Sequence, residues 1–287
     1  MYDVEEDVQP AALPWRTGGI GRLLMKGIGK VLIRLLTVAL AVVFVVSGYH
    51  VWEILHDRRT AETAYEDLDA FVRSEGTEAG TETREEEAQD GAVSLEDSPS
   101  AFPEVDFDGL RSINEQVVGW IYDEASVINY PIVQAQDNDY YLYRMFNGES
   151  NPSGAIFLDC HNQSDFSDTH CIIYGHHMKD GSMFAALANY KSQEYYEEHP
   201  QMLLLTPGGN YTIEIFAGYV ANVEDDAWVM GFASEEDYEN WIASSISKSL
   251  IRADFTPSAS DHVLTLSTCS YEFEDARFVL LGVLRAR

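Results

Sequence analysis

Three side chains of this sequence could together perform acyl transfer. Cys269 ends the β-like run Thr265–Cys269, Arg277 follows eight residues later, and His176 stands after Gly175 about ninety residues upstream. A thiol can attack a carbonyl carbon, an imidazole can move the proton, and a guanidinium can hold the developing oxyanion. The three residues therefore predict a cysteine-dependent acyl-transfer site.

Each of these residues also has a plainer interpretation. A single cysteine such as Cys269 is often a buried structural residue, and His177 competes with His176 for the imidazole role. Arg277 could instead pair with an acid of the loop before it, Glu272, Glu274 or Asp275. If the runs before and after that short loop are antiparallel neighbours, Arg277 returns to the level of Cys269. The functional interpretation therefore depends on strand pairing.

Short β-rich runs separated by turn residues must position these side chains. Pro207-Gly208-Gly209-Asn210 predicts a hairpin turn between two of the runs. Eight runs with this punctuation predict a mostly β fold, an eight-stranded closed or nearly closed barrel with peripheral helices. The predicted strands are 118–122, 127–133, 155–159, 171–174, 202–206, 211–222, 262–269 and 277–285.

Four helical patterns interrupt these strands. They cover residues 107–113, 138–145, 182–199 and 234–247. The last pattern lies inside a long connection between the runs that end at Asn222 and begin at His262. Because a connection of this length in a compact barrel is usually functional, residues 223–247 are candidate substrate contacts.

A single N-terminal apolar stretch predicts a membrane anchor. Residues 35–52 carry no charge, which is long enough for a spanning helix. Arg58 and Arg59 follow the stretch, whereas five basic residues precede it, so the bias predicts a cytoplasmic N-terminus. A cleaved signal peptide is the alternative, but its apolar region would be unusually long and no small-residue cleavage pattern follows. The preceding basic residues are Arg16, Arg22, Lys26, Lys30 and Arg34.

Composition divides the chain into four predicted parts. These are a basic cytoplasmic segment 1–30, a transmembrane anchor 31–55, a membrane-proximal helix with an acidic linker 56–100, and a catalytic domain 101–287. Residues 74–99 hold nine acids, one arginine and no aromatic residue, which predicts a disordered spacer. The net charge of −30 should repel phosphate backbones, so nucleic acid is excluded as a partner.

The remaining cysteines and histidines leave two further possibilities open. Three cysteines make an odd count, so at least one is unpaired within a single chain. Cys160 and Cys171 flank a polar stretch and could form a disulfide or simply be small buried residues. A zinc site is a rival interpretation, but no CxxC or HExxH spacing is present, so we predict no metal and no organic cofactor. Its candidate ligands are His161, His170, Cys171, His176 and His177.

Taken together, these segments resemble a class B sortase from about Phe107 onward. Thr265-Leu266-Ser267-Thr268-Cys269 matches the TLxTC signature of that family, and the spacing to Arg277 also matches. The segment from Tyr174 to Phe184 looks like the one that bears the catalytic histidine of class B. Similar segments are Tyr130-Pro131-Ile132-Val133-Gln134, Asp137–Tyr143, Ser153–Asp159 and Phe278–Gly282.

The resemblance implies a sortase barrel with a helix in the connection before the cysteine strand. It implies a transpeptidase anchored in a Gram-positive cell membrane by one span, with an extracellular catalytic domain. In the family the histidine that follows glycine is catalytic, which selects His176 over His177. Cys269 is then the nucleophile and Arg277 the oxyanion stabiliser, with Ser267 and Thr268 as candidate substrate contacts.

The resemblance also implies the substrates. These are surface proteins with a C-terminal sorting signal of the Asn-Pro-x-Thr-Asn/Gly kind, cleaved after Thr through a thioester. The acceptor is an amine of a cell-wall precursor or of a pilin. Two alternatives stay open: a cysteine hydrolase that gives the thioester to water, and a non-catalytic surface binding module in which the three residues are structural.

Overall fold

The fold is seen in a computed structural model that describes residues 19–73, 103–123 and 128–287. The chain divides into two compact units, Met1–His56 and Asp57–Arg287. The predicted acidic spacer 74–99 and the first 18 residues of the predicted basic segment lie outside the described residues.

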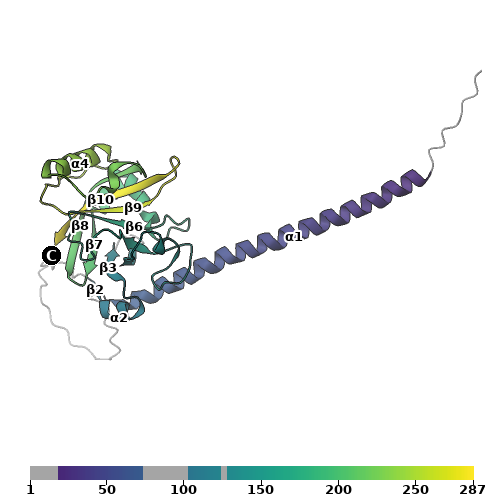
Figure 1. Ribbon diagram of the computed structural model, residues 1–287, viewed down its shortest axis with the longest axis horizontal. Helices are drawn as coiled ribbons and strands as arrows, with labels where there is room; N and C mark the ends of the chain where they lie inside the picture. Colours follow the sequence, from purple (N-terminus) through teal and green to yellow (C-terminus); the bar gives the residue numbers. More distant parts are fainter. Residues whose placement is uncertain (1–18, 74–102, 124–127) are drawn as a thin grey trace, which may run out of the picture. The chain divides into compact units, whose positions relative to one another are not determined.

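Eight strands of the larger unit form a closed barrel, which confirms the predicted fold class (Figure 1). The order around the barrel is β10-β8-β7-β3-β4-β5-β6-β9. The pairs β4–β5 and β6–β9 are parallel, and the other described pairs of the barrel are antiparallel. The strands are β3 (Val117–Tyr122), β4 (Asn129–Val133), β5 (Ile156–Leu158), β6 (His170–Tyr174), β7 (Gln201–Thr206), β8 (Gly209–Asn222), β9 (Val263–Cys269) and β10 (Ala276–Ala286).

Side chains on β9 and β10 alternate between two buried layers, because successive residues of a strand point to opposite faces. Leu266 of β9 and Phe278 of β10 belong to the cluster inside the barrel. Val263 and Val279 belong to a second cluster on the outer face, which Trp241 of α4 (Glu235–Lys248) helps to cover. Burial on both faces fixes these two strands rigidly.

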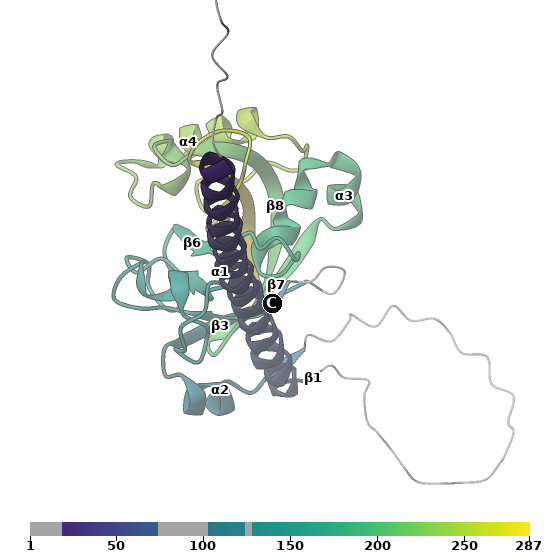
Figure 2. The ribbon, with the colours of Figure 1, turned by 90° about the vertical axis from the view of Figure 1, so that its right-hand side faces the viewer.

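Short helices surround the barrel, and Figures 1 and 2 show α4 at one end of it and α2 at the opposite end. α4 is capped by the Ser234 hydroxyl, which accepts the backbone N–H of Asp237. Its acidic first turn and Lys248 in its last turn complement the helix dipole. The other helical elements are α2 (Phe107–Ile113), η2 (Tyr140–Tyr143), η3 (Phe184–Lys191), α3 (Gln193–Glu198) and η4 (Asp226–Trp228).

Two predicted helices differ from the observed ones. The segment 138–145 contains only the single 3₁₀ turn η2. The segment 182–199 is split into η3 and α3 by Ser192, whose backbone is extended and whose hydroxyl caps α3. The hydrophobic pattern is similar in both helix types, so the pattern did not reveal the break.

The apolar N-terminal stretch forms α1 (Gly19–Glu66). Among the described residues, one helix is long and apolar enough to cross a membrane by length and composition. The predicted anchor 31–55 lies within α1. Such a helix is found in membrane anchors and in signal sequences, and its position in the chain fits either.

The residues that follow His56 belong to the same compact unit as the barrel. Leu68 in η1 (Asp67–Phe71) is only 5% exposed, in a cluster with Leu110, Trp120 and Phe146. The Tyr65 hydroxyl donates to the Gly154 carbonyl at 2.8 Å. The compact unit that contains the barrel therefore begins at Asp57, within the predicted part 56–100.

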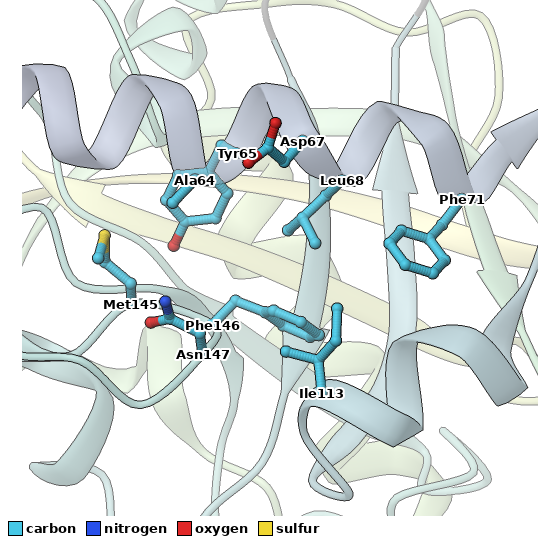
Figure 3. Close-up of a pocket in the computed structure, with 9 residues that line it drawn as sticks. All are labelled: Ala64, Tyr65, Asp67, Leu68, Phe71, Ile113, Met145, Phe146 and Asn147. Atoms are coloured by element: carbon cyan, nitrogen blue, oxygen red, sulfur yellow. The ribbon is translucent and has the colours of Figure 1, made fainter.

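A small cavity of about 220 Å³ lies where the segment from Asp57 to Phe71 packs against the rest of its unit (Figure 3). Side chains from the end of α1, from η1 and from the loop after η2 surround it, with Ile113 of α2 opposite Leu68. A further pairing, of β1 (Val72–Arg73) with β2 (Glu104–Val105), was not predicted. The segment is therefore held by apolar contacts and by backbone hydrogen bonds.

Candidate active site

Three neighbouring strands bring the predicted catalytic side chains together. β9 lies between β6, which is parallel to it, and β10, which is antiparallel. Tyr174 pairs with Ser267, and the next backbone N–H, of Gly175, donates to the Ser267 carbonyl at 3.1 Å. His176 therefore comes alongside Cys269, because both stand two residues beyond that pair.

Arg277 reaches the site from the other side of β9. It is paired directly with Cys269 in the β9–β10 register, as the short loop between the strands predicts. Directly paired residues of antiparallel strands point to the same face. The thiol and the guanidinium therefore share the outer face of the barrel.

Gly175 allows the chain to leave β6 at this point. A β-carbon there would stand 2.4 Å from Ile156 Cδ1 and 2.7 Å from the ring of Phe184. Any side chain would push the chain away from these buried groups. The Gly175-His176 pair thus places the imidazole close to the barrel wall.

The His176 ring is oriented by a backbone carbonyl. Its Nε2 donates to the Leu142 carbonyl at 2.6 Å, which leaves Nδ1 as the nitrogen that can face Cys269. Gly154 makes room for this contact, since a β-carbon there would lie 2.7 Å from the Leu142 oxygen and 3.0 Å from His176 Cδ2. Sequence reasoning missed Leu142, because a carbonyl acceptor leaves no trace in side-chain type. Gly154 could be found only as a glycine within the segment Ser153–Asp159.

The surroundings shift the two titrating groups toward the charged pair. The hydrogen bond with His176 lowers the pKa of the Cys269 thiol, and the Arg277 charge lowers it further, against partial burial. The hydrogen bond with Cys269 raises the pKa of His176, and the Leu142 carbonyl adds to this, against burial and the Arg277 charge. Both shifts favour a thiolate beside an imidazolium.

Arg277 keeps its charge available to the site. Its Nη1 donates to the Ala276 carbonyl at 3.0 Å, and it forms no salt bridge within the part of the chain that the structure describes. Glu272, one of the acids that could have paired with it, instead binds Lys191 at 2.5 Å. Hydrogen bonds from Lys191 and Ser270 lower the pKa of Glu272 to about 2.

His177 has a different role from His176. Its Nδ1 donates to the backbone carbonyl of Cys269 at 3.1 Å, and its ring meets Tyr271 edge to face at 5.4 Å. The His176 ring therefore interacts with the thiol of Cys269, whereas the His177 ring binds the backbone carbonyl of the same residue.

The two candidate substrate contacts occupy opposite faces of β9. Ser267 shares the face of Cys269, is 2% exposed, and accepts a hydrogen bond from Trp228 Nε1 at 3.4 Å. Thr268 is turned to the barrel interior beside Phe278 and is also 2% exposed. Its hydroxyl has no partner among the described residues. The Thr268 side chain is therefore turned away from the face that carries Cys269.

Cys160, Cys171 and His170 lie apart from the Cys269–His176 pair. All three cysteines are free thiols, so Cys160 and Cys171 form no disulfide here. His170 is buried, with Nδ1 donating to the Val229 carbonyl at 2.6 Å and Nε2 accepting from Thr265 at 2.7 Å. Burial lowers the His170 pKa to about 4. The five residues of the zinc alternative therefore do not form one cluster within the described residues.

Comparison with known proteins gives a consistent result. A sortase domain model matches residues 124–285. Sortase B of Listeria monocytogenes is 32% identical over 253 residues, which are 87% of this chain and 95% of that relative. A sortase B–substrate complex from Staphylococcus aureus has a TM-score of 0.60 at 31% identity, covering 63% of this chain and 84% of that one. Sortase B of Bacillus anthracis has a TM-score of 0.66 at 30% identity, covering 81% and 100%. The chain therefore belongs to the sortase family of cysteine transpeptidases, next to members named sortase B.

Proposed function

We propose that Cys269, His176 and Arg277 are the catalytic residues of this transpeptidase. The observation that carries the proposal is their meeting at the neighbouring ends of β6, β9 and β10, with His176 two residues beyond β6. The opposed pKa shifts of the thiol and the imidazole support it, because each group stabilises the charged form of the other.

The reaction follows from this geometry. The Cys269 thiolate attacks the threonine carbonyl of a bound peptide, and Arg277 stabilises the oxyanion that forms. His176 gives its proton to the leaving amine as the C–N bond breaks, and a thioester remains. An acceptor amine then attacks the thioester, gives its proton to His176, and releases Cys269 as thiolate.

The proposed donor is a surface protein with an Asn-Pro-x-Thr-Asn/Gly signal, cleaved after Thr. The proposed acceptor is an amine of a cell-wall precursor or of a pilin. Support comes from relatives, since a Staphylococcus aureus sortase B is known with its substrate and a sortase B is known in complex with triglycine. Ser267 stays a proposed contact, because it lies on the face of Cys269 next to Trp228.

We place the catalytic unit outside the cell, on a helix that spans the membrane once with its N-terminus inside. The excess of basic residues before the apolar stretch of α1 supports this orientation. The test uses the chain with a peptide tag added at its N-terminus. Protease added to intact cells should degrade the part of the chain after the apolar stretch and leave the tag intact. Degradation of the tag instead would reverse the orientation.

The activity is tested with the full chain in detergent and a fluorogenic Asn-Pro-Gln-Thr-Asn peptide, with and without a glycine amine. We expect cleavage and an amine-ligated product that both disappear in Cys269→Ala. Cleavage without ligation in the presence of amine would instead indicate the hydrolase. Activity retained by Cys269→Ala would refute the mechanism.

A further inference from the structure

Three different metal-binding atoms converge at the end of β5, on residues that the proposed mechanism does not use. A carboxylate oxygen of Asp159, the sulfur of Cys160 and a ring nitrogen of His161 all lie within 4.8 Å of one another. Cys160 Sγ is 3.4 Å from His161 Nδ1, and this nitrogen is 2.8 Å from Asp159 Oδ1. Both short contacts therefore end on the same ring nitrogen.

A proton relay cannot use this arrangement. A neutral ring nitrogen carries either a proton or a lone pair, so Nδ1 can donate to Asp159 or accept from Cys160, but not both. In a Cys-His-Asp relay the thiol and the carboxylate form hydrogen bonds with different ring nitrogens of the histidine. A cation between the three atoms would accept a lone pair from each of them.

The spacing suits a tetrahedral divalent ion. Bonds of about 2.3 Å to sulfur and about 2.0 Å to nitrogen place these two ligand atoms about 3.5 Å apart. The observed distance between Cys160 Sγ and His161 Nδ1 is 3.4 Å. The carboxylate contact of 2.8 Å needs to open by only about half an ångström to reach tetrahedral spacing.

The carboxylate is already held in place by hydrogen bonds. Asp159 is 3% exposed, and its Oδ2 accepts from Tyr174 at 2.9 Å and from Asn138 at 2.8 Å. Asn138 also accepts the backbone N–H of Cys160 at 2.8 Å, which fixes the turn that carries the thiol. Partners of this kind orient ligating carboxylates in metal sites. Oδ1 is the oxygen that faces His161.

The opposite side of the cluster is open. The His161 side chain is 73% exposed and Cys160 is partly exposed, so a cation can enter and water can complete its coordination. The Asp159 carboxylate places a negative charge beside the thiol, which favours a cation at this position.

We propose that Asp159, Cys160 and His161 form a surface site for a borderline-soft divalent cation of the Zn²⁺ class. Mixed sulfur, nitrogen and oxygen ligands match the preferences of this class better than those of Mg²⁺ or Ca²⁺. Binding displaces the thiol proton of Cys160 to solvent, and the imidazole binds as the neutral ring with its proton on Nε2. The site lies outside the transpeptidation chemistry.

The test uses Co²⁺ as the probe and removes the other thiol–imidazole pair first. The full chain with Cys269→Ala, in detergent, is reduced, freed of metal with a chelator and titrated with Co²⁺. We expect a thiolate-to-Co²⁺ charge-transfer band that saturates at one equivalent and is abolished when Zn²⁺ displaces the probe. Absence of the band in this variant would overturn the proposal.

Two substitutions assign the band. Adding Cys160→Ser should remove it, and adding His161→Ala should weaken Co²⁺ binding more than about tenfold. His262→Ala is the matched control, since the ring of this exposed histidine donates to the Asp168 carbonyl, and it should leave the affinity unchanged. A band that survives Cys160→Ser contradicts the assignment.

A second readout does not depend on colour. Zn²⁺ should protect Cys160 from alkylation in the Cys269→Ala chain, measured on the peptide that carries Cys160 by mass spectrometry. Equal alkylation rates with Zn²⁺ and with chelator would exclude cation binding at this thiol.

Discussion

Cys269 is the one cysteine of this sequence whose surroundings favour the thiolate. Burial raises the pKa of Cys171 to about 12. Burial and the Asp159 carboxylate raise the pKa of Cys160. Cys269 is itself partly buried, but His176 and Arg277 outweigh that effect. Reactivity therefore comes from the two neighbours rather than from exposure.

Replacing His176 by Ala should shift the pH dependence of Cys269 alkylation to higher pH. The hydrogen bond with His176 is the largest effect that lowers the thiol pKa, so its loss raises that pKa. The rate of alkylation as a function of pH, followed by mass spectrometry, measures the shift. His177→Ala is the control, because the His177 ring bonds the Cys269 carbonyl rather than the thiol. Equal pH midpoints in the two variants would contradict the prediction.

Replacing Arg277 by Gln should lower kcat by about 10²–10³, as for loss of an oxyanion donor. We expect kcat to depend on pH as a bell-shaped curve, with one limb for Cys269 and one for His176. In Arg277→Gln this whole curve should move to higher pH. The guanidinium charge lowers the pKa of both Cys269 and His176, so both limbs rise when it is removed. Arg277→Lys keeps the charge and should leave the limbs in place at reduced kcat. An unshifted profile in Arg277→Gln would mean that the Arg277 charge does not affect the pKa of Cys269 or His176.

At the scale of elements, the loop that holds His176 depends on one glycine. Gly154 has φ +60° and lies against the Leu142 carbonyl. Gly154→Ala should lower kcat more than about tenfold, because the new β-carbon displaces the group that orients the imidazole. Gly148→Ala is the matched control: its φ is +82°, but its nearest neighbour would be 3.8 Å away. Equal losses in both variants would show that backbone strain alone is responsible.

The strands could be predicted from sequence because alternation and turn residues are local signals. The pairing of Arg277 with Cys269 was also predictable, since a short loop joins their strands. The parallel pairing of β6 with β9 could not be predicted, because the sequence of neither strand indicates which strand, about ninety residues away, it pairs with. His176 was therefore selected by resemblance rather than by geometry, and the Leu142 carbonyl that orients it was found only in the structure.

At the scale of the whole molecule, the catalytic unit extends to the segment after His56. Leu68→Ala should destabilise this unit by about 2–5 kcal/mol, because the side chain is almost fully buried among apolar residues. Urea unfolding of the full chain followed by Trp fluorescence measures the change. Glu62→Ala, at an exposed position of α1 shortly before η1, should leave the midpoint within error. An unchanged midpoint in Leu68→Ala would mean that the segment does not stabilise the barrel.

The position of Cys269 between β6 and β10 links its chemistry to the order of folding. Its activating neighbours come from strands that meet only when the barrel closes, and β9 and β10 are the last barrel strands in chain order. A chain that has not yet folded carries an ordinary thiol with little thiolate at neutral pH. Closure of the barrel therefore activates the proposed nucleophile, so that an unfolded chain does not attack carbonyl groups of its own or of neighbouring chains.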